Sequence, residues 1–215
     1  MPFLGVAACS TSLPDATPSA SATYTVQSGQ CAGNINLVNN DVTINIESGA
    51  APFQAGKSIV FPTTTAVIAN FKLLVTGVNW AVSEKLFSGG HADNLELQGA
   101  LIEFKDSTIT STVSDPIGFS GKLTTSSRYT VNTTTVSVTT SGSGVELPGA
   151  ISGSTVTVSS STISVSGSSW CYGVHLGSIA ETSSVLLQNS TITSATTGFS
   201  KEAFGVRLQG SVADS

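Results

Sequence analysis

The sequence contains little charge. Only 10% of its 215 residues are Asp, Glu, Lys or Arg, against about 25% in a typical soluble domain. The net charge is −5 and the isoelectric point is about 4.8. Nucleic-acid binding needs a basic surface, so we expect no nucleic-acid partner.

Long apolar runs are also missing. No run approaches the roughly 18 residues of a membrane-spanning helix, so we expect no membrane span. Helical periodicity and runs rich in Ala, Leu, Glu and Lys are absent, which excludes a helical solenoid. Ser, Thr and Gly replace the charged residues, and apolar residues alternate with them, which excludes a disordered chain.

Cysteine is scarce, with Cys9, Cys31 and Cys171 as the whole set. An odd, sparse set predicts no disulfide framework. In stacked repeats Cys31 and Cys171 would lie several layers apart, beyond the Cα separation of about 7 Å that a disulfide tolerates. We expect both to be small core residues.

Residues 6–9 are similar to a bacterial lipidation motif ending at Cys9. The basic region and the apolar core of about 7–15 residues that a signal peptide needs are missing before it. Lipidation at Cys9 is therefore disfavoured.

The segment Val156–Val165 recurs along the chain. Related segments lie at 102–109, 129–138 and 185–192, at spacings of 27–29 residues, and a fainter copy lies at 75–82. Self-similarity at such a period is typical of a solenoid. Strand residues i and i+2 share a face, so Val156, Val158, Ile163 and Val165 are predicted core residues.

A repeat this short cannot bury its apolar face alone, so the units must stack. We predict an all-β fold, a single-stranded right-handed parallel β-helix (β-solenoid) of six or seven coils with about 27–29 residues per coil. Residues 1–22 are predicted to be a flexible or truncated segment, 23–70 an irregular N-terminal cap within the solenoid (23–215), and 71–215 the regular coils. The chain stops inside a coil, so we expect the solenoid to belong to a longer polypeptide.

The "NSTIT" corner at 189–193 and the GVxL strands at 144–147, 173–176 and 205–208 resemble the right-handed parallel β-helix of the pectin-lyase-like superfamily. The resemblance covers residues 65–215 and is nearest to Ser/Thr-rich adhesins, autotransporter passengers and dispersed-gene-family surface proteins. It implies a non-catalytic secreted or cell-surface scaffold, adhesin-like, with glycans or host or cell-surface proteins as partners. A carbohydrate-active enzyme of the same fold is the alternative that the resemblance implies, because the superfamily contains polysaccharide lyases and glycoside hydrolases.

Aligning the coils stacks equivalent residues into columns. The outward residue of the GVxL strand forms a column of Glu96, Gly118, Glu146, His175 and Arg207. Glu146, His175 and Arg207 should lie on successive coils, where a carboxylate, an imidazole and a guanidinium could bind a sugar or an anion. The alternative is a solvated edge of opposite charges, whose exposed pairs contribute under about 1 kcal/mol.

Two further columns are polar. The corner column of Asn79, Asp106, Thr133, Ser160 and Asn189 is predicted to form turns. The outward column of Thr108, Thr135, Thr162 and Thr191 is typical of β propensity. An ice-binding solenoid is a second alternative function, and it would need two adjacent threonine ranks. Asn132 and Asn189 begin glycosylation sequons, which matter only in a secreted eukaryotic protein.

The enzyme alternative has weak support in the sequence. Glycoside hydrolases need two carboxyl groups about 5–9.5 Å apart, and the six aspartates neither pair nor stack on one another in the aligned coils. No Ser–His–Asp arrangement, Cys/His metal spacing, P-loop or dinucleotide fingerprint is present. We therefore expect no catalytic residue, no metal site and no cofactor, and we extend the prediction to an extracellular or cell-surface location.

Overall fold

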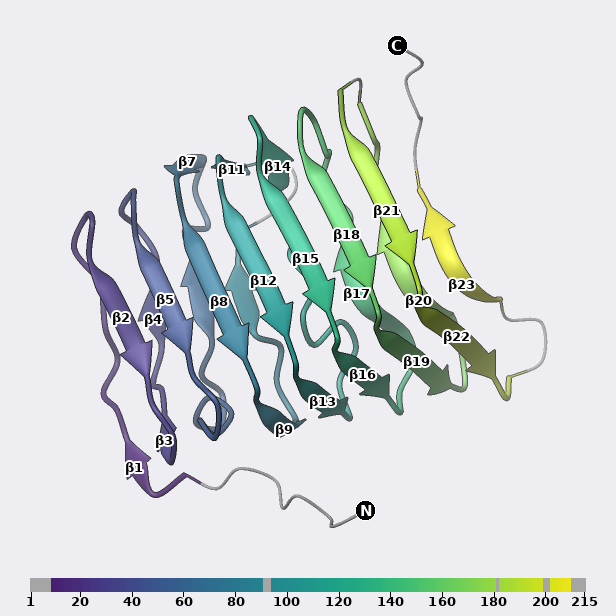
Figure 1. Cartoon of the computed structure of the whole chain (residues 1–215), viewed down its shortest axis with the longest axis horizontal. Helices are drawn as coiled ribbons and strands as arrows, with labels where there is room; N and C mark the ends of the chain where they lie inside the picture. Colours follow the sequence, from purple (N-terminus) through teal and green to yellow (C-terminus); the bar gives the residue numbers. More distant parts are fainter. Residues whose placement is uncertain (1–8, 91–93, 181, 199–201, 210–215) are drawn as a thin grey trace.

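The computed structural model describes residues 9–90, 94–180, 182–198 and 202–209, and within these it is entirely β (Figure 1). Every strand pairing is parallel, and successive strands of each sheet come from successive coils. The predicted all-β parallel solenoid is confirmed.

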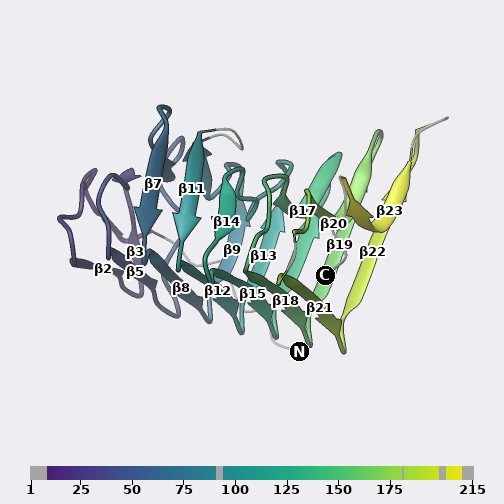
Figure 2. The same cartoon turned by 90° about the horizontal axis from the view of Figure 1, so that it is seen from above.

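One sheet runs the length of the molecule (Figure 2). Its seven strands are β2 (Thr23–Val26), β5 (Thr43–Ile46), β8 (Lys72–Thr76), β12 (Leu101–Lys105), β15 (Arg128–Asn132), β18 (Thr155–Ser159) and β21 (Ser184–Gln188). A five-stranded sheet lies around the corner from it and contains β9 (Asn79–Val82), β13 (Thr108–Ser111), β16 (Thr135–Val138), β19 (Thr162–Gly167) and β22 (Thr191–Thr196). Five coils thus contribute a strand to both sheets.

We call the remaining long side the third face. It comprises β4 (Ile35–Asn36), β6 (Ile59–Phe61) and β10 (Phe87–Gly89), then residues 112–121, then β17 (Gly142–Leu147), β20 (Cys171–Leu176) and β23 (Ala203–Leu208). Residues 112–121 join its two sheets, because Leu86 N–H donates to Pro116 O at 2.9 Å and Phe119 N–H donates to Glu146 O at 2.8 Å. A short sheet of β7 (Ala66–Ala69), β11 (Leu95–Gln98) and β14 (Lys122–Thr124) lies between the third face and the long sheet.

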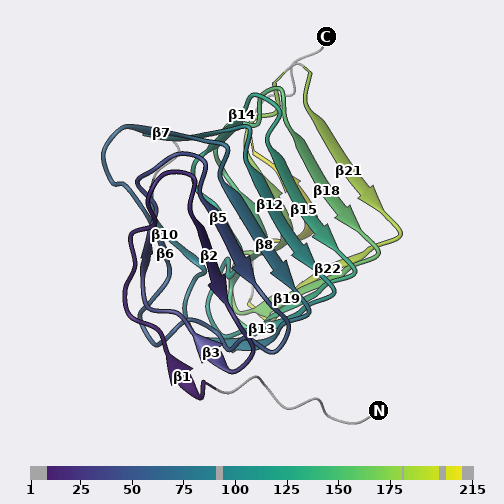
Figure 3. The ribbon, with the colours of Figure 1, turned by 60° about the vertical axis from the view of Figure 1, so that its left-hand side comes forward.

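The sheets enclose a common interior (Figure 3), and one cluster of buried apolar side chains forms the core. The register stacks Val131, Val158 and Leu187 in the long sheet, and Val136, Ile163 and Ile192 in the five-stranded sheet. Val156, Val158, Ile163 and Val165 are all buried, as predicted.

The corner between the two long sheets repeats from coil to coil. Asp106, Thr133, Ser160 and Asn189 have φ between 48° and 51°, in the left-handed region that Asn, Asp and Gly tolerate best. The predicted corner column is correct for these four. Thr76 pairs with Lys105, so the residue equivalent to Asp106 in the preceding coil is Gly77, which has φ 65°. The assignment of Asn79 to this column was wrong, because Asn79 lies in β9.

The N-terminal part is more ordered than predicted. β1 (Thr11–Ser12) pairs with β3 (Gln30–Cys31), and Ala16 forms a bridge with Ile35, so the end of the predicted flexible segment packs on the first coil. β2 and β5 already belong to the long sheet, so regular stacking begins before residue 71.

Cys9 and Cys31 form a disulfide with Cα atoms 5.3 Å apart, which contradicts the prediction that no disulfide forms. In this state the Cys9 sulfur is not available for a lipid. Cys171 is a buried free thiol, as predicted.

The stacked core predicts the effect of truncating Phe104. Its ring is fully buried and lies 6.0 Å from the Tyr129 ring, centroid to centroid. Phe104→Ala should lower the free energy of unfolding by about 3–5 kcal/mol, because a cavity remains. Glu103→Ala on the same strand should change it by about 0.5 kcal/mol or less. Urea denaturation measures both, and a loss below about 1 kcal/mol for Phe104→Ala would contradict this packing.

The disulfide predicts a labelling pattern. A thiol reagent should modify no cysteine of the folded, oxidised protein, only Cys171 after unfolding, and all three cysteines after unfolding with a reductant. Mass spectrometry of the labelled peptides measures this. Labelling of Cys9 or Cys31 without reductant would show that the bridge does not form.

Candidate functional site

The third face brings together the three residues predicted as an ionisable cluster. Glu146 on β17 pairs with His175 on β20, which pairs with Arg207 on β23. His175 Nδ1 lies 3.1 Å from Glu146 Oε1, and His175 Nε2 lies 2.8 Å from Gln209 Oε1. Both ring nitrogens thus lie within hydrogen-bonding distance of a side-chain oxygen. A binding role for the cluster stays a prediction.

Tyr172 and Phe204 lie on one side of this cluster. Tyr172 stacks with Phe204 on the next coil, with ring centroids 6.2 Å apart, and its centroid lies 5.2 Å from that of His175. The Arg207 guanidinium donates to the Tyr172 hydroxyl and lies over its ring, 4.7 Å from the centroid. Tyr172 and His175 are buried, whereas Phe204 is 45% exposed and Trp170 is 43% exposed. The buried Tyr172 and His175 side chains thus support the Phe204 ring and the Arg207 guanidinium at the surface.

The predicted column is only partly correct. Glu96 lies on β11, where it pairs with Val67 and Lys122, so it belongs to another sheet. Its carboxylate accepts bonds from Thr124 and Gln98, which lower its pKa. Gly118 does lie next to Glu146, since a Cβ on Gly118 would come within 3.0 Å of Glu146 Cβ.

An ion pair between a buried aspartate and a half-exposed lysine extends the row towards the N-terminus. Asp115 Oδ2 lies 2.9 Å from Lys85 Nζ, and Asp115 Oδ1 accepts the Ser143 N–H at 2.7 Å. Burial raises the pKa of Asp115, but the hydrogen bond and charge of Lys85, together with the Ser143 N–H, outweigh burial and hold that pKa below its ordinary value. Sequence reasoning missed this pair, although Lys85 and Asp115 are one coil apart.

Asp115 also lies beside Glu146. A Cβ on Gly118 would lie 3.1 Å from Asp115 Cβ as well as 3.0 Å from Glu146 Cβ, so the two carboxylates flank this glycine. Because Asp115 and Glu146 fall in different columns of the aligned coils, the sequence did not predict this juxtaposition.

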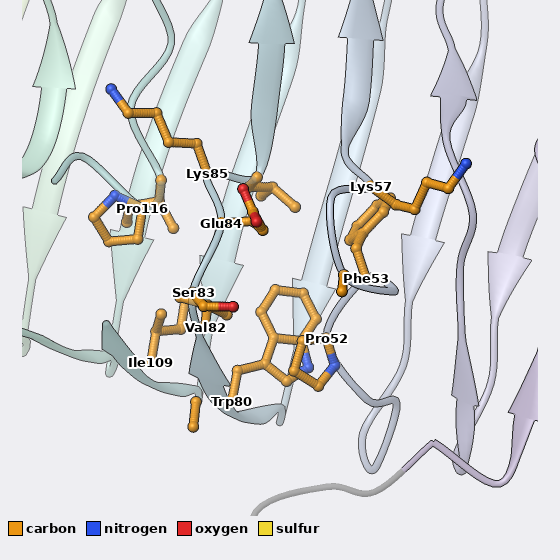
Figure 4. A pocket seen from close by; sticks show the side chains of 14 residues that line it. Pro52, Phe53, Lys57, Trp80, Val82, Ser83, Glu84, Lys85, Ile109 and Pro116 are labelled. Atoms are coloured by element: carbon orange, nitrogen blue, oxygen red, sulfur yellow. The ribbon is translucent and has the colours of Figure 1, made fainter. Parts of the chain in front are cut away.

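A groove opens on the same face over the earlier coils. It has a volume of about 770 Å³. A smaller cavity, lined by Trp80 and the residues shown in Figure 4, adjoins it, and we call this the Trp80 cavity. Lys57, Glu84 and Lys85 line both the groove and the cavity. Hydroxyl groups of successive coils line the groove: Ser58, Ser88, Ser114 and Ser141. Lys57, which lines the groove, pairs with Asp15 of the N-terminal segment at 3.0 Å. Neutral hydroxyls and paired charges therefore succeed one another along the third face.

The other predicted positions lie elsewhere. Thr108, Thr135, Thr162 and Thr191 form one exposed rank in register. The parallel rank two residues on contains Ser137 and Ser164, so this sheet does not have two threonine ranks. Asn132 ends β15 and accepts from Ser159 Oγ at 3.0 Å, whereas Asn189 is an exposed corner residue.

Two negative observations concern the described residues alone. They contain no group of three or more His, Cys, Asp or Glu side chains placed to hold a metal ion. Within the same residues, no helix is long and apolar enough to cross a membrane.

No protein family, curated protein or solved structure matches this chain.

The Asp115 site predicts a pH-dependent stability difference. Asp115→Asn should lower the free energy of unfolding by about 1–3 kcal/mol at neutral pH, because the amide carries no charge for Lys85 and is a weaker acceptor for the Ser143 N–H. The pKa of Asp115 is lowered on folding from 3.8, so its stabilisation is complete well above that pH and is lost as pH falls through the folded value. Urea denaturation across this range should show the two proteins converge in acid.

Asp15→Asn is the matched control, since its pair with Lys57 is exposed and exposed pairs contribute little. A difference for Asp115→Asn that stays constant into strong acid would contradict the assignment.

Proposed function

We propose that this chain is a non-catalytic, adhesin-like scaffold of the extracellular space or cell surface that binds an extended glycan along the third face. One observation carries the proposal: the groove hydroxyls, the Lys85–Asp115 pair and the Glu146–His175–Arg207 row succeed one another over successive coils on one side. Successive rungs lie about 4.8 Å apart. A linear polymer of hydroxylated rings could therefore contact several coils at once.

The exposed rings suit a sugar ligand. Phe204 stacks on Tyr172, over whose ring the Arg207 guanidinium lies, and Trp170 is a second exposed ring two residues before Tyr172. Sites that combine apolar rings with a few oriented polar groups are typical of small-molecule and sugar recognition. Because Tyr172 and His175 already hold Arg207 and Glu146 in place, little side-chain entropy would be lost on binding.

The proposed location rests on a second observation. The Cys9–Cys31 disulfide favours an oxidising compartment, since disulfides are rare in the reducing cytosol. The low charge of the chain and its hydroxyl-rich surface support the same location, as does the resemblance to the pectin-lyase-like superfamily at 65–215.

Catalysis on a polysaccharide is the second candidate function. Asp115 and Glu146 flank Gly118, and paired carboxylates are the machinery of glycoside hydrolysis. The Lys85 and Ser143 contacts keep Asp115 ionised, so Glu146 would have to supply the acid.

Glycan binding is testable with a panel of soluble neutral and acidic polysaccharides. Isothermal titration should show saturable binding that weakens about tenfold in Trp170→Ala and in Arg207→Ala, the equivalent of about 1.4 kcal/mol. Thr135→Ala, on the five-stranded sheet, is the control and should bind like the parent. Absence of binding across the panel, or equal loss in all three variants, would contradict the proposal.

The same panel separates the two functions. Release of reducing ends, or of unsaturated sugars, that Glu146→Gln abolishes would replace the scaffold proposal with an enzyme. Binding without product supports the scaffold.

A further inference from the structure

The Trp80 cavity lies where two connections of neighbouring coils meet, beside the groove (Figure 4). Residues 50–57, between β5 and β6, form one wall, and residues 83–86, between β9 and β10, form another. Its volume is about 160 Å³. Its apolar lining includes Pro52, Phe53, Trp80, Val82, Ile109 and Pro116.

The walls of this cavity are held before any ligand arrives. Trp80 Nε1 donates to Ala50 O at 2.8 Å, which ties the indole to the first wall. Leu86 N–H donates to Pro116 O at 2.9 Å, which ties the second wall to the next coil. Trp80 and Pro116 are buried, and the rings of Pro52 and Pro116 restrict the backbone around the opening. A preformed pocket binds without the cost of ordering its own side chains.

The polar side chains at this cavity differ in whether an ion pair already holds them. Figure 4 shows the Lys57 and Lys85 side chains extending away from each other on opposite sides, while Glu84 lies between Pro116 and Phe53. Both lysines are paired with aspartates, Lys57 with Asp15 and Lys85 with Asp115. Ser83 and Glu84 therefore remain as the polar groups that the cavity offers to a ligand, and a carboxylate favours a hydrogen-bond donor.

Size and lining together define the ligand class. A cavity of about 150 Å³ with apolar walls accommodates one benzene-sized ring. Burial of a ring against Trp80 and Phe53 would supply the hydrophobic contribution, and a donor on that ring could reach the Glu84 carboxylate. We propose that the Trp80 cavity binds a single aromatic ring bearing a hydroxyl group, that is, a small phenol. This cavity adjoins the groove and shares Lys57, Glu84 and Lys85 with it, but the proposal does not rest on the proposed function.

The chain allows a direct optical test, because it has two tryptophans, Trp80 and Trp170. In the full chain carrying Trp170→Phe, Trp80 is the sole source of tryptophan fluorescence. Titration with phenol should change this fluorescence saturably. Toluene, which has a similar volume and no donor, should bind more weakly. Glu84→Gln should reduce the preference for phenol over toluene roughly twofold to fivefold, since a charged acceptor becomes a neutral one.

Ala55→Phe is the blocking variant, because Ala55 is an exposed residue of the lining and a ring there should occupy the opening. Circular dichroism and the melting temperature confirm that each variant is folded. Loss of the saturable response in Ala55→Phe supports the site. An equal response in Ala55→Phe and in the protein that keeps Ala55, or toluene binding as tightly as phenol, overturns the proposal. Failure of glycan binding leaves these outcomes unchanged, so the two proposals fail independently.

Discussion

A hydroxyl at the corner between the two long sheets, supplied in four successive coils by Ser107, Thr134, Ser161 and Ser190, is the contact on which this solenoid depends. At the turn between the two long sheets, Ser107 N–H donates to Thr134 Oγ1 at 3.4 Å, and Thr134 N–H and Ser161 N–H each donate to the serine one coil on at 3.1 Å. Thr134 and Ser161 donate in turn to carbonyls two residues back, at 2.8 and 2.7 Å. An unpaired buried N–H costs about 1–3 kcal/mol, so the hydroxyl ladder makes a tight, buried corner possible.

This corner separates the part of the coil that must repeat from the part that can vary. Strands on either side of it are in strict register, 27 or 29 residues apart from β5 to β21. The third face lies away from the corner and has unequal connections, with one gap filled by residues 112–121. Ionisable and aromatic side chains gather there because a change in length or chemistry on that face does not disturb the hydroxyl ladder. Function can therefore change on this face while the fold is kept.

Features that recur once per coil could be predicted from the sequence, and irregular features could not. Core residues, the left-handed corner and the Glu146–His175–Arg207 row all recur at one coil's spacing, so alignment places them. Glu96 was misplaced because "LELQ" alternates like a GVxL strand, and alternation alone does not say which sheet a strand joins. Cys9–Cys31 was missed because the first coil is shorter: Thr23 pairs with Thr43, only 20 residues on. Lys85–Asp115 joins two irregular connections, which no periodicity describes.

The outer surface of the five-stranded sheet and the third face differ in how firmly their polar side chains are held in place. On the five-stranded sheet the threonine rank is exposed, and each hydroxyl repeats a neighbour of the same kind. On the third face the groups differ from coil to coil and constrain one another: Glu146 and Gln209 bracket His175, and Tyr172 lies beneath Arg207. The buried His175 and Tyr172 side chains restrain their half-exposed partners, because a change in their own geometry would leave a buried polar atom unpaired. A ligand that needs fixed directions of hydrogen bonding is therefore better served by the third face than by the regular threonine rank.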